Sequence, residues 1–312
     1  MSGAVTSVDE PPYGFDEDAE TRRLLRSRPP RAALVWAGAV LGGTVVSARA
    51  LRGGLSSAMH AVTVALSGGG TVEAVLRRYV RADVVAEEPD IAAREAGTLR
   101  LVESLDLPTP RLLGADHTGS AAGVPAVLMS RLPGKVVWSP SDMDRWLRRL
   151  ADPLPTIHAA TPPAGTVRPF DPYAQQSYDL PGWARWPAMW ERAVEIFHGP
   201  RPDGPETFIH RDFHPGNVLW RRGAVTGVVD WQSASVGPPA MDVGHCRCNL
   251  LPYGRDAVDR FTAMWEDTTG LTFHPWADVV AIIGFLDYLR DDPPSDRYVV
   301  EDALARSVAE LG

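Results

Sequence analysis

The residues best suited to chemistry lie in one short segment, residues 209–232, with the sequence IHRDFHPGNVLWRRGAVTGVVDWQ. Asp212 and Asn217 are five positions apart, and Asp230 follows a predicted hairpin at the end of an apolar run. A carboxylate can orient a hydroxyl group and accept its proton, while a second carboxylate and an amide offer oxygen ligands suited to Mg²⁺. These groups are the ones that phosphoryl transfer from ATP to a hydroxyl requires.

The spacing lets us assign a role to each of these three residues. We expect Asp212 to be the catalytic base, and Asn217 and Asp230 to hold magnesium from two loops that the hairpin brings together. An isolated His-x-Asp sequence carries little information. The fixed spacing, combined with a strand that ends in Asp230, is specific.

Two stretches of the chain resemble a known family. HRDFHPGNVLW and VVDWQSASVGPPAMDVG are similar to the catalytic and metal-binding segments of the aminoglycoside phosphotransferase and choline kinase-like family, a branch of the protein-kinase-like fold. The resemblance covers roughly residues 52–250. It implies a two-lobed α+β fold, ATP (GTP is possible) and Mg²⁺ as cofactors, and transfer of the γ-phosphate to a hydroxyl of a small molecule.

The resemblance also assigns residues to the nucleotide. A glycine- and serine-rich turn would cover the triphosphate, and a charged pair on the third strand and the following helix would hold the α- and β-phosphates. Backbone groups after the last strand of the first lobe would bond the adenine. These residues are Gly53, Gly54, Ser56, Ser57, Arg77, Glu95, Met129 and Arg131.

Arg77 departs from the family pattern, because related kinases carry a lysine at this position. A guanidinium keeps the positive charge but is planar and bulkier than an ammonium group. Strand alternation puts Arg77 and Arg78 on opposite faces, so only one of them can face the cleft. We favour Arg77, with Glu95 as its partner, and Arg78 remains the alternative.

Three further residues of the motif are expected to support the site. In the resembling family the histidine at the position of His210 packs beneath the catalytic loop, and we treat His214 as a residue that orients this loop. Asp242 resembles a buried carboxylate that binds the amides of the loop. A buried acid must be paired, which makes this scaffold role credible.

The acceptor side is less well defined. Trp183, Trp186 and Trp190 are spaced three and four apart, which predicts one face of a helix and fits either a core stripe or a stacking platform for a sugar. Asp287 and Tyr288 lie near the end of a late helix, where they could line an acidic substrate pocket or simply face solvent. The candidate substrate residues are therefore Trp183, Asp287 and Tyr288.

Three functions remain open at this point. The first is a kinase that inactivates an antibiotic, such as an aminoglycoside or a macrolide. The second is a metabolic kinase for choline, an amino acid or a sugar, which would use the same catalytic residues. The third is a catalytically silent nucleotide-binding module. Such a module would have lost the catalytic base or a metal ligand, whereas Asp212, Asn217 and Asp230 are all present.

Composition narrows the possible partners. The 312 residues carry 31 basic and 39 acidic side chains, and a net charge of −8 disfavours a nucleic acid as partner. The N-terminus lacks the pattern of a secretory signal, and the longest apolar stretch falls short of the ~20 residues that span a bilayer. We expect a cytoplasmic protein without a membrane partner, either a monomer or a homodimer, that binds a hydroxylated small molecule.

The elements that must position these residues follow an α+β pattern. We expect a loose arm at 1–28, an N-lobe at 29–132 with a five-stranded antiparallel sheet and one helix, and a mainly helical C-lobe at 133–312. The strands are predicted at 44–51, 58–66, 71–80, 111–116 and 126–132, and the helix at 84–105. Helices are predicted at 141–160, 183–197, 239–250, 255–268, 276–290 and 296–311, with a hairpin at 218–230.

Overall fold

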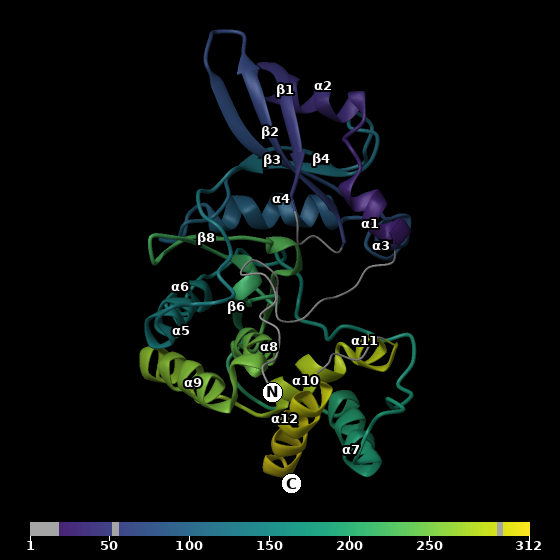
Figure 1. Cartoon of the computed structure of the whole chain (residues 1–312), viewed down its shortest axis with the longest axis vertical. Coiled ribbons are helices and arrows are strands. Elements are labelled where there is room, and N and C mark those ends of the chain that lie inside the picture. The colour runs from purple at the N-terminus through teal and green to yellow at the C-terminus, as the bar shows by residue number, and fades with distance from the viewer. Residues whose placement is uncertain (1–18, 52–55, 292–295) are drawn as a thin grey trace, which may run out of the picture. The chain divides into compact units, whose positions relative to one another are not determined.

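The structure, a computed structural model, describes residues 19–51, 56–291 and 296–312. It divides into two compact units (Figure 1). The sheet unit is the described chain up to Gly134 together with Thr226–Gln232, and the helical unit is Lys135–Val225 with Ser233–Gly312. Asp230 therefore belongs to the sheet unit, whereas Asp212 and Asn217 belong to the helical unit.

The sheet unit contains the expected five-stranded antiparallel sheet, with the strand order β1-β2-β3-β5-β4. Its register places Arg77 opposite Met59 on one neighbouring strand and opposite Val127 on the other. The α+β class and the antiparallel sheet are thus confirmed. The strands are β1 Gly43–Ala50, β2 Ala58–Leu66, β3 Thr71–Arg78, β4 Leu112–Asp116 and β5 Ala126–Ser130.

Helices cover both faces of this sheet. The helix α2 (Arg31–Val40) follows α1 (Ala19–Arg26), and its small residues Ala33 and Ala37 pack on the strand residues Ala74, Leu76 and Leu128. Glycine makes the close approach possible, because a Cβ on Gly38 would lie 2.7 Å from the backbone oxygen of Gly43. Arg77 points to the opposite face, where α4 lies.

The prediction of one long helix at 84–105 is wrong. The chain forms α3 (Ala82–Glu87) and α4 (Ile91–Val102) instead. Pro89 stands between them, and a proline has no backbone N–H to continue the hydrogen bonding of a helix. The break lets α4 start afresh and bury Glu95 and Leu99.

The helical unit contains most of the remaining elements. It also holds the short antiparallel pair of β6 (Thr207–Ile209) and β9 (Ser235–Gly237). The hairpin strands β7 (Val218–Arg221) and β8 (Ala224–Val228) carry the chain from this unit back to the sheet unit. The helices are α5 Met143–Ala151, α6 Pro153–His158, α7 Pro187–His198, α8 Ala240–Leu250, α9 Arg255–Thr269, α10 Trp276–Ile283, α11 Leu286–Asp291 and α12 Arg297–Glu310.

Three predicted helices differ from the observed ones. The helix expected at 141–160 is divided between α5 and α6 at Pro153, and the helix expected at 276–290 is interrupted between α10 and α11. The helix expected from residue 183 begins at Pro187, whose fixed φ suits the first turn of a helix. Trp183 and Trp186 therefore precede the helix, and the prediction that they share one helical face with Trp190 is wrong.

Close packing of α8 against α10 sets the position of the residues beneath the loop that carries Asp212. A Cβ on Gly244 would lie 2.8 Å from the backbone of Ala277, so only glycine fits at this contact. This contact fixes the helix that carries Asp242. Within the described ranges, no helix is both long enough and apolar enough to cross a membrane.

Candidate active site

The loop that carries Asp212 is anchored by one buried carboxylate. Asp242 is fully buried, and it accepts hydrogen bonds from the backbone N–H groups of His210 (3.0 Å) and Arg211 (2.6 Å). The Nε2 atom of His158 lies 3.0 Å from the same carboxylate. Asp242 thus has the amide contacts that the sequence analysis expected of it.

The backbone of this loop is strained. Arg211 has a φ of 69°, in the left-handed region that residues other than glycine rarely adopt. Such a conformation costs about 1–3 kcal/mol and persists only where its surroundings hold it. Here Asp242 holds the amide of Arg211 itself, and the guanidinium of Arg211 stacks on the ring of Tyr173.

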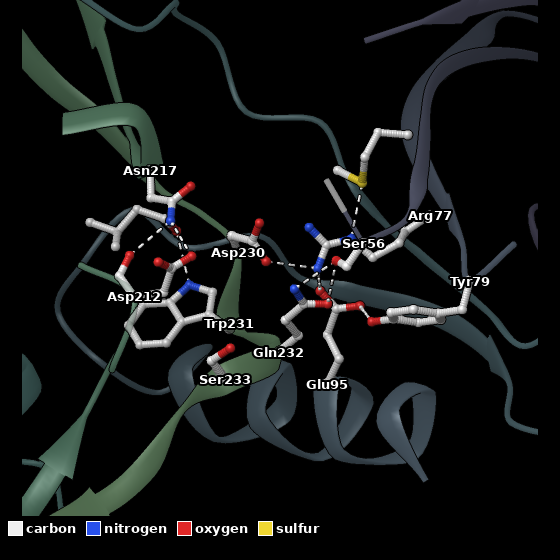
Figure 2. A network of polar contacts seen from close by, with 12 residues as sticks. Ser56, Arg77, Tyr79, Glu95, Asp212, Asn217, Asp230, Trp231, Gln232 and Ser233 are labelled. Carbon is white, nitrogen blue, oxygen red and sulfur yellow. Dashed lines mark hydrogen bonds and ion pairs between the residues drawn. The ribbon is translucent and has the colours of Figure 1, made fainter. Parts of the chain in front are cut away.

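Asp212 is held at both carboxylate oxygens. The Nδ2 group of Asn217 donates to Asp212 Oδ2 over 3.0 Å and to the backbone oxygen of Asp212 over 2.8 Å (Figure 2). His245 places its Nε2 atom 2.9 Å from Asp212 Oδ1. Because the amide nitrogen of Asn217 faces Asp212, its carbonyl oxygen is the atom left to serve as a metal ligand.

The histidines around Asp212 keep it ionised. Burial raises the pKa of Asp212, but the hydrogen bond from His245 and the charges of His214, His245 and His210 lower it by more. The pKa is therefore held well below its usual value, and Asp212 is a carboxylate at any physiological pH.

Asp212, His214 and His245 also form the one His and Asp cluster in the described chain with donor atoms close enough for a metal ion. The Nδ1 atom of His214 accepts a hydrogen bond from the backbone N–H of Gly216 at 3.1 Å. A neutral imidazole that accepts at Nδ1 carries its proton on Nε2. The Nε2 atom that faces Asp212 is therefore a donor and is unsuited to a metal.

A second polar network lies in the sheet unit. The Nη1 atom of Arg77 contacts Glu95 Oε1 at 2.5 Å and Asp230 Oδ1 at 3.0 Å, and the hydroxyl of Tyr79 donates to Glu95 Oε2 over 2.7 Å (Figure 2). Arg77 and Glu95 are almost completely buried. Burial lowers the pKa of Arg77, but the charges of Asp230 and Glu95 raise it by more, so the guanidinium stays charged.

This network shows which of the two arginines pairs with Glu95. Glu95 pairs with Arg77, whereas Arg78 lies on the other face of β3 near His60. Asp230 has a φ of 70°, so both loops that carry candidate site residues contain a strained position. This ion pair joins Arg77, which is expected to bind phosphate, to Asp230, which is expected to bind metal.

The other nucleotide residues are partly described. Gly53 and Gly54 lie outside the described residues. Ser56 accepts a hydrogen bond from the Nε2 group of Gln232 at 3.0 Å, and Ser57 is buried. Met129 is a buried residue of β5. The side chain of Arg131 pairs with Glu73 at 2.7 Å, so the expected contact of Arg131 with adenine would use its backbone groups.

The candidate substrate residues take part in contacts within the helical unit. Trp183 donates from Nε1 to the backbone oxygen of Leu289 at 2.8 Å and stacks edge-on against Trp190. Asp287 accepts from the backbone N–H of Gln176 at 2.6 Å and pairs with Arg290 at 2.9 Å. Tyr288 lies on the same helix, α11.

The sequence analysis missed His245, His158 and Tyr79. His245 had a detectable signal, because it lies three residues after Asp242 on a predicted helix and must share its face. Tyr79 had a weaker signal, because it alternates with Arg77 along the third strand. His158 is 84 residues from its partner Asp242, and no local pattern connects the two.

Comparison with known proteins gives partial relatives of defined activity. A homoserine kinase of Allorhizobium ampelinum is 30% identical over 156 residues, which is 45% of this chain and 46% of the relative. A homoserine kinase of Rhizobium johnstonii is 30% identical over 182 residues, 52% of this chain and 54% of the relative. The chain spans about half the length of these curated relatives.

Solved structures are similar over most of the chain. The aminoglycoside phosphotransferase APH(4)-Ia, as a thermostable mutant in complex with ADP and hygromycin B, has a TM-score of 0.62 and 17% identity, and the likeness covers 88% of this chain and 98% of that one. The macrolide 2'-phosphotransferase MphH of Brachybacterium faecium has a TM-score of 0.59 and 20% identity, with 89% and 98% coverage. At these identities the likeness shows the fold.

A match to a family profile over most of the chain identifies the family. Residues 47–278 match the profile of the phosphotransferase enzyme family, a range that includes β3, the catalytic loop and α8. The resemblance inferred from the motifs is thus confirmed. The chain belongs to the phosphotransferase enzyme family and has its protein-kinase-like fold.

Proposed function

We propose that this protein transfers the γ-phosphate of ATP, or alternatively GTP, to a hydroxyl group of a small molecule. The observation that carries the proposal is the fixed carboxylate of Asp212, held at both oxygens on a strained loop that Asp242 anchors. Family membership and the ADP complex of a structural neighbour support the choice of nucleotide.

In the proposed reaction the acceptor hydroxyl donates its hydrogen bond to Asp212. As the oxygen attacks the γ-phosphorus, its proton passes to the carboxylate, and the bond to the β-phosphate oxygen breaks. Arg77 offers a buried, permanently charged guanidinium for the phosphates of the departing ADP. Ser56 and Ser57, with Gly53 and Gly54, cover the triphosphate in this proposal.

The oxygen donors of Asn217 and Asp230 fit magnesium. Mg²⁺ prefers carboxylate and carbonyl oxygens, and Asn217 already directs its nitrogen toward Asp212. When bound, the ion supplies positive charge that offsets the charge of the phosphates. Asp230 would have to share its carboxylate between this ion and Arg77.

For the acceptor we propose an antibiotic, in line with the aminoglycoside and macrolide phosphotransferases among the structural neighbours. The charge of Asp287 is already balanced by Arg290, which favours a neutral acceptor over a polycation. The second candidate is a metabolic hydroxyl compound, because the partial curated relatives are homoserine kinases. We further propose that the protein acts in the cytoplasm, where ATP is available, as a monomer or a homodimer and without a nucleic-acid or membrane partner.

An acceptor screen tests the proposal. Purified protein is incubated with Mg²⁺ and ATP or GTP, and ADP or GDP release is measured for macrolides, aminoglycosides, homoserine, choline and sugars. We expect release to rise with one chemical class of acceptor, and mass spectrometry to find that acceptor 80 Da heavier, the mass of one added phosphoryl group. Nucleotide binding without turnover of any acceptor would instead favour a catalytically silent module.

A further inference from the structure

We propose that His245 is a positioning residue for phosphoryl transfer, which holds the carboxylate of Asp212 in one orientation through an Nε2–H hydrogen bond. The inference rests on the proposed function, because it gives a role to a residue that acts through the catalytic base. His245 lies outside the HxDxxxxN motif and outside the residues that we expect to bind metal.

The position of His245 is fixed by its helix. It follows Gly244, where α8 packs against the backbone of Ala277, and it lies three residues after the loop anchor Asp242. Its ring is buried and packs against Phe285, with 5.5 Å between ring centroids. One face of α8 thus holds both the backbone of the catalytic loop and the side chain of its base.

The hydrogen bond from His245 complements that from Asn217. Asn217 donates to Oδ2 of Asp212 and His245 donates to Oδ1, at 3.0 and 2.9 Å. Two donors on opposite oxygens prevent rotation of the carboxylate about its Cβ–Cγ bond. Each oxygen accepts more than one hydrogen bond, so an acceptor hydroxyl can still bind in a defined direction.

His214 strengthens the same arrangement from the loop side. Its Nδ1 atom accepts from the N–H of Gly216, which puts the proton of the neutral ring on Nε2, 3.9 Å from Asp212 Oδ1. The rings of His214 and His245 lie 5.6 Å apart. Two imidazole N–H groups therefore face the carboxylate, which is an arrangement for holding an anion.

Kinetics of two His245 variants test the proposal. His245→Phe keeps a flat ring against Phe285 but removes the donor, and we expect kcat to fall about 10-fold or more with little change in the KM for ATP. His245→Gln keeps an N–H donor that can reach Asp212, so its kcat should recover to within about 3-fold of the parent. Cys248→Ala, on the same helix, controls for disturbance of α8.

These kinetic outcomes separate the inference from the proposed function. If the parent phosphorylates its acceptor and His245→Phe does so at the same rate, the role of His245 is refuted while the proposed function stands. If His245→Gln is as impaired as His245→Phe although both melt cooperatively near the parental temperature, the donor is not what matters, and the proposal is again refuted.

A contact measurement keeps the proposal testable without any acceptor. Imidazole ¹H–¹⁵N NMR spectra of the full-length protein should show an Nε2-protonated His245 with a slowly exchanging proton, and this signal should be lost in Asp212→Ala. A proton on Nδ1 instead, or a signal that Asp212→Ala leaves unchanged, would overturn the proposal.

Zinc provides the last arm of the test. A zinc ion would need the Nε2 atoms of His214 and His245 without protons, so we expect Zn²⁺ to bind the parent and His245→Gln equally weakly in calorimetry. Tight binding that His245→Gln abolishes would show that the cluster is a metal site, and the proposal would be wrong.

Discussion

At the scale of single residues, two charge systems make up the candidate site. Asp212 is surrounded by N–H donors, while Asp230 and Glu95 share one guanidinium. Hydrogen bonds to charged groups contribute about 1.5–3 kcal/mol each, roughly twice the value for neutral pairs. Conservative substitutions at these residues should therefore have measurable effects on turnover.

Asp212→Ala should lower kcat by about 10²- to 10⁴-fold, because it removes the group that orients the hydroxyl and accepts its proton. The affinity for ATP should stay close to the parental value, since the residues assigned to the triphosphate are unchanged. Rapid-quench turnover and calorimetric ATP titration measure the two quantities. Parental turnover in this variant would show that another residue is the base.

Arg77→Lys should be more harmful than its conserved charge suggests. Both carboxylates contact the Nη1 atom at the end of the long arginine side chain. The shorter lysine side chain places its ammonium elsewhere and has no counterpart of the Nε contact with Met59, and each lost charged bond costs about 1.5–3 kcal/mol. We expect a higher KM for ATP and a kcat reduced about 10-fold. Arg78→Lys, on the opposite strand face, is the matched control and should retain parental kinetics.

At the scale of elements, buried carboxylates hold loops in place. Asp242 of α8 binds the catalytic loop, and Asp116 at the end of β4 binds the loop before β5. Loops have few internal hydrogen bonds, so a buried acceptor that collects several backbone N–H groups determines their shape. Stability and activity should respond differently to the loss of these two anchors.

Asp242→Asn should impair both stability and turnover. Its amide group replaces one acceptor oxygen by a donor and leaves at least one buried N–H of His210 or Arg211 unsatisfied, at a cost of about 1–3 kcal/mol. Urea denaturation and steady-state kinetics measure the two effects. Asp259→Asn removes an exposed pair with Arg255 and should change stability by no more than about 0.5 kcal/mol. Equal stability of both variants would contradict the anchor role.

Asp116→Asn should affect stability in a pH-dependent way. Burial raises the pKa of Asp116, but backbone N–H groups of Gly119, Ser120, Ala121 and Ala122 lower it by more. A depressed pKa contributes stability above the unfolded value of about 3.9 and loses it as the pH falls through the folded value. The difference from the parent in denaturation free energy should be largest near neutral pH and shrink below about pH 4. A constant difference would exclude the charge as its cause.

At the scale of the whole molecule, two separate segments of the chain build the sheet unit. The chain leaves the sheet unit at Gly134 and returns to it with Thr226–Gln232, which brings Asp230 to Arg77. A nucleotide that binds the folded protein stabilises it by mass action. Metal-dependent stabilisation is therefore a readout of Asp230 that needs no acceptor.

At a concentration 100 times its dissociation constant, ATP with Mg²⁺ should stabilise the folded protein by about 2.7 kcal/mol. The melting temperature should rise accordingly. Asp230→Asn should reduce the additional effect of Mg²⁺, because the variant loses one charged oxygen donor of the proposed metal site. Differential scanning calorimetry with ATP alone and with ATP and Mg²⁺ measures the difference. An unchanged effect of Mg²⁺ would count against Asp230 as a ligand.

Much of the fold could be predicted from local pattern. The first three strands follow from β-like segments between glycine-rich turns, and the five-stranded sheet is antiparallel as expected. Helix boundaries were less accurate wherever a proline interrupts an apolar pattern, as at Pro89 and Pro153, because the periodicity continues across the break. The spacing of Trp183, Trp186 and Trp190 likewise predicted a single helical face. Spacing alone does not show that the helix begins at Pro187.

Local spacing in the sequence was enough to identify the family and to predict Asp212, Asn217 and Asp230 as the candidate catalytic and metal-binding residues. Which groups contact these residues follows from the tertiary structure. Arg77 reaches Asp230 across 153 positions, and His158 reaches Asp242 across 84. Contacts between such distant positions depend on how helices and strands pack, and a buried charge must find its partner wherever that packing provides one.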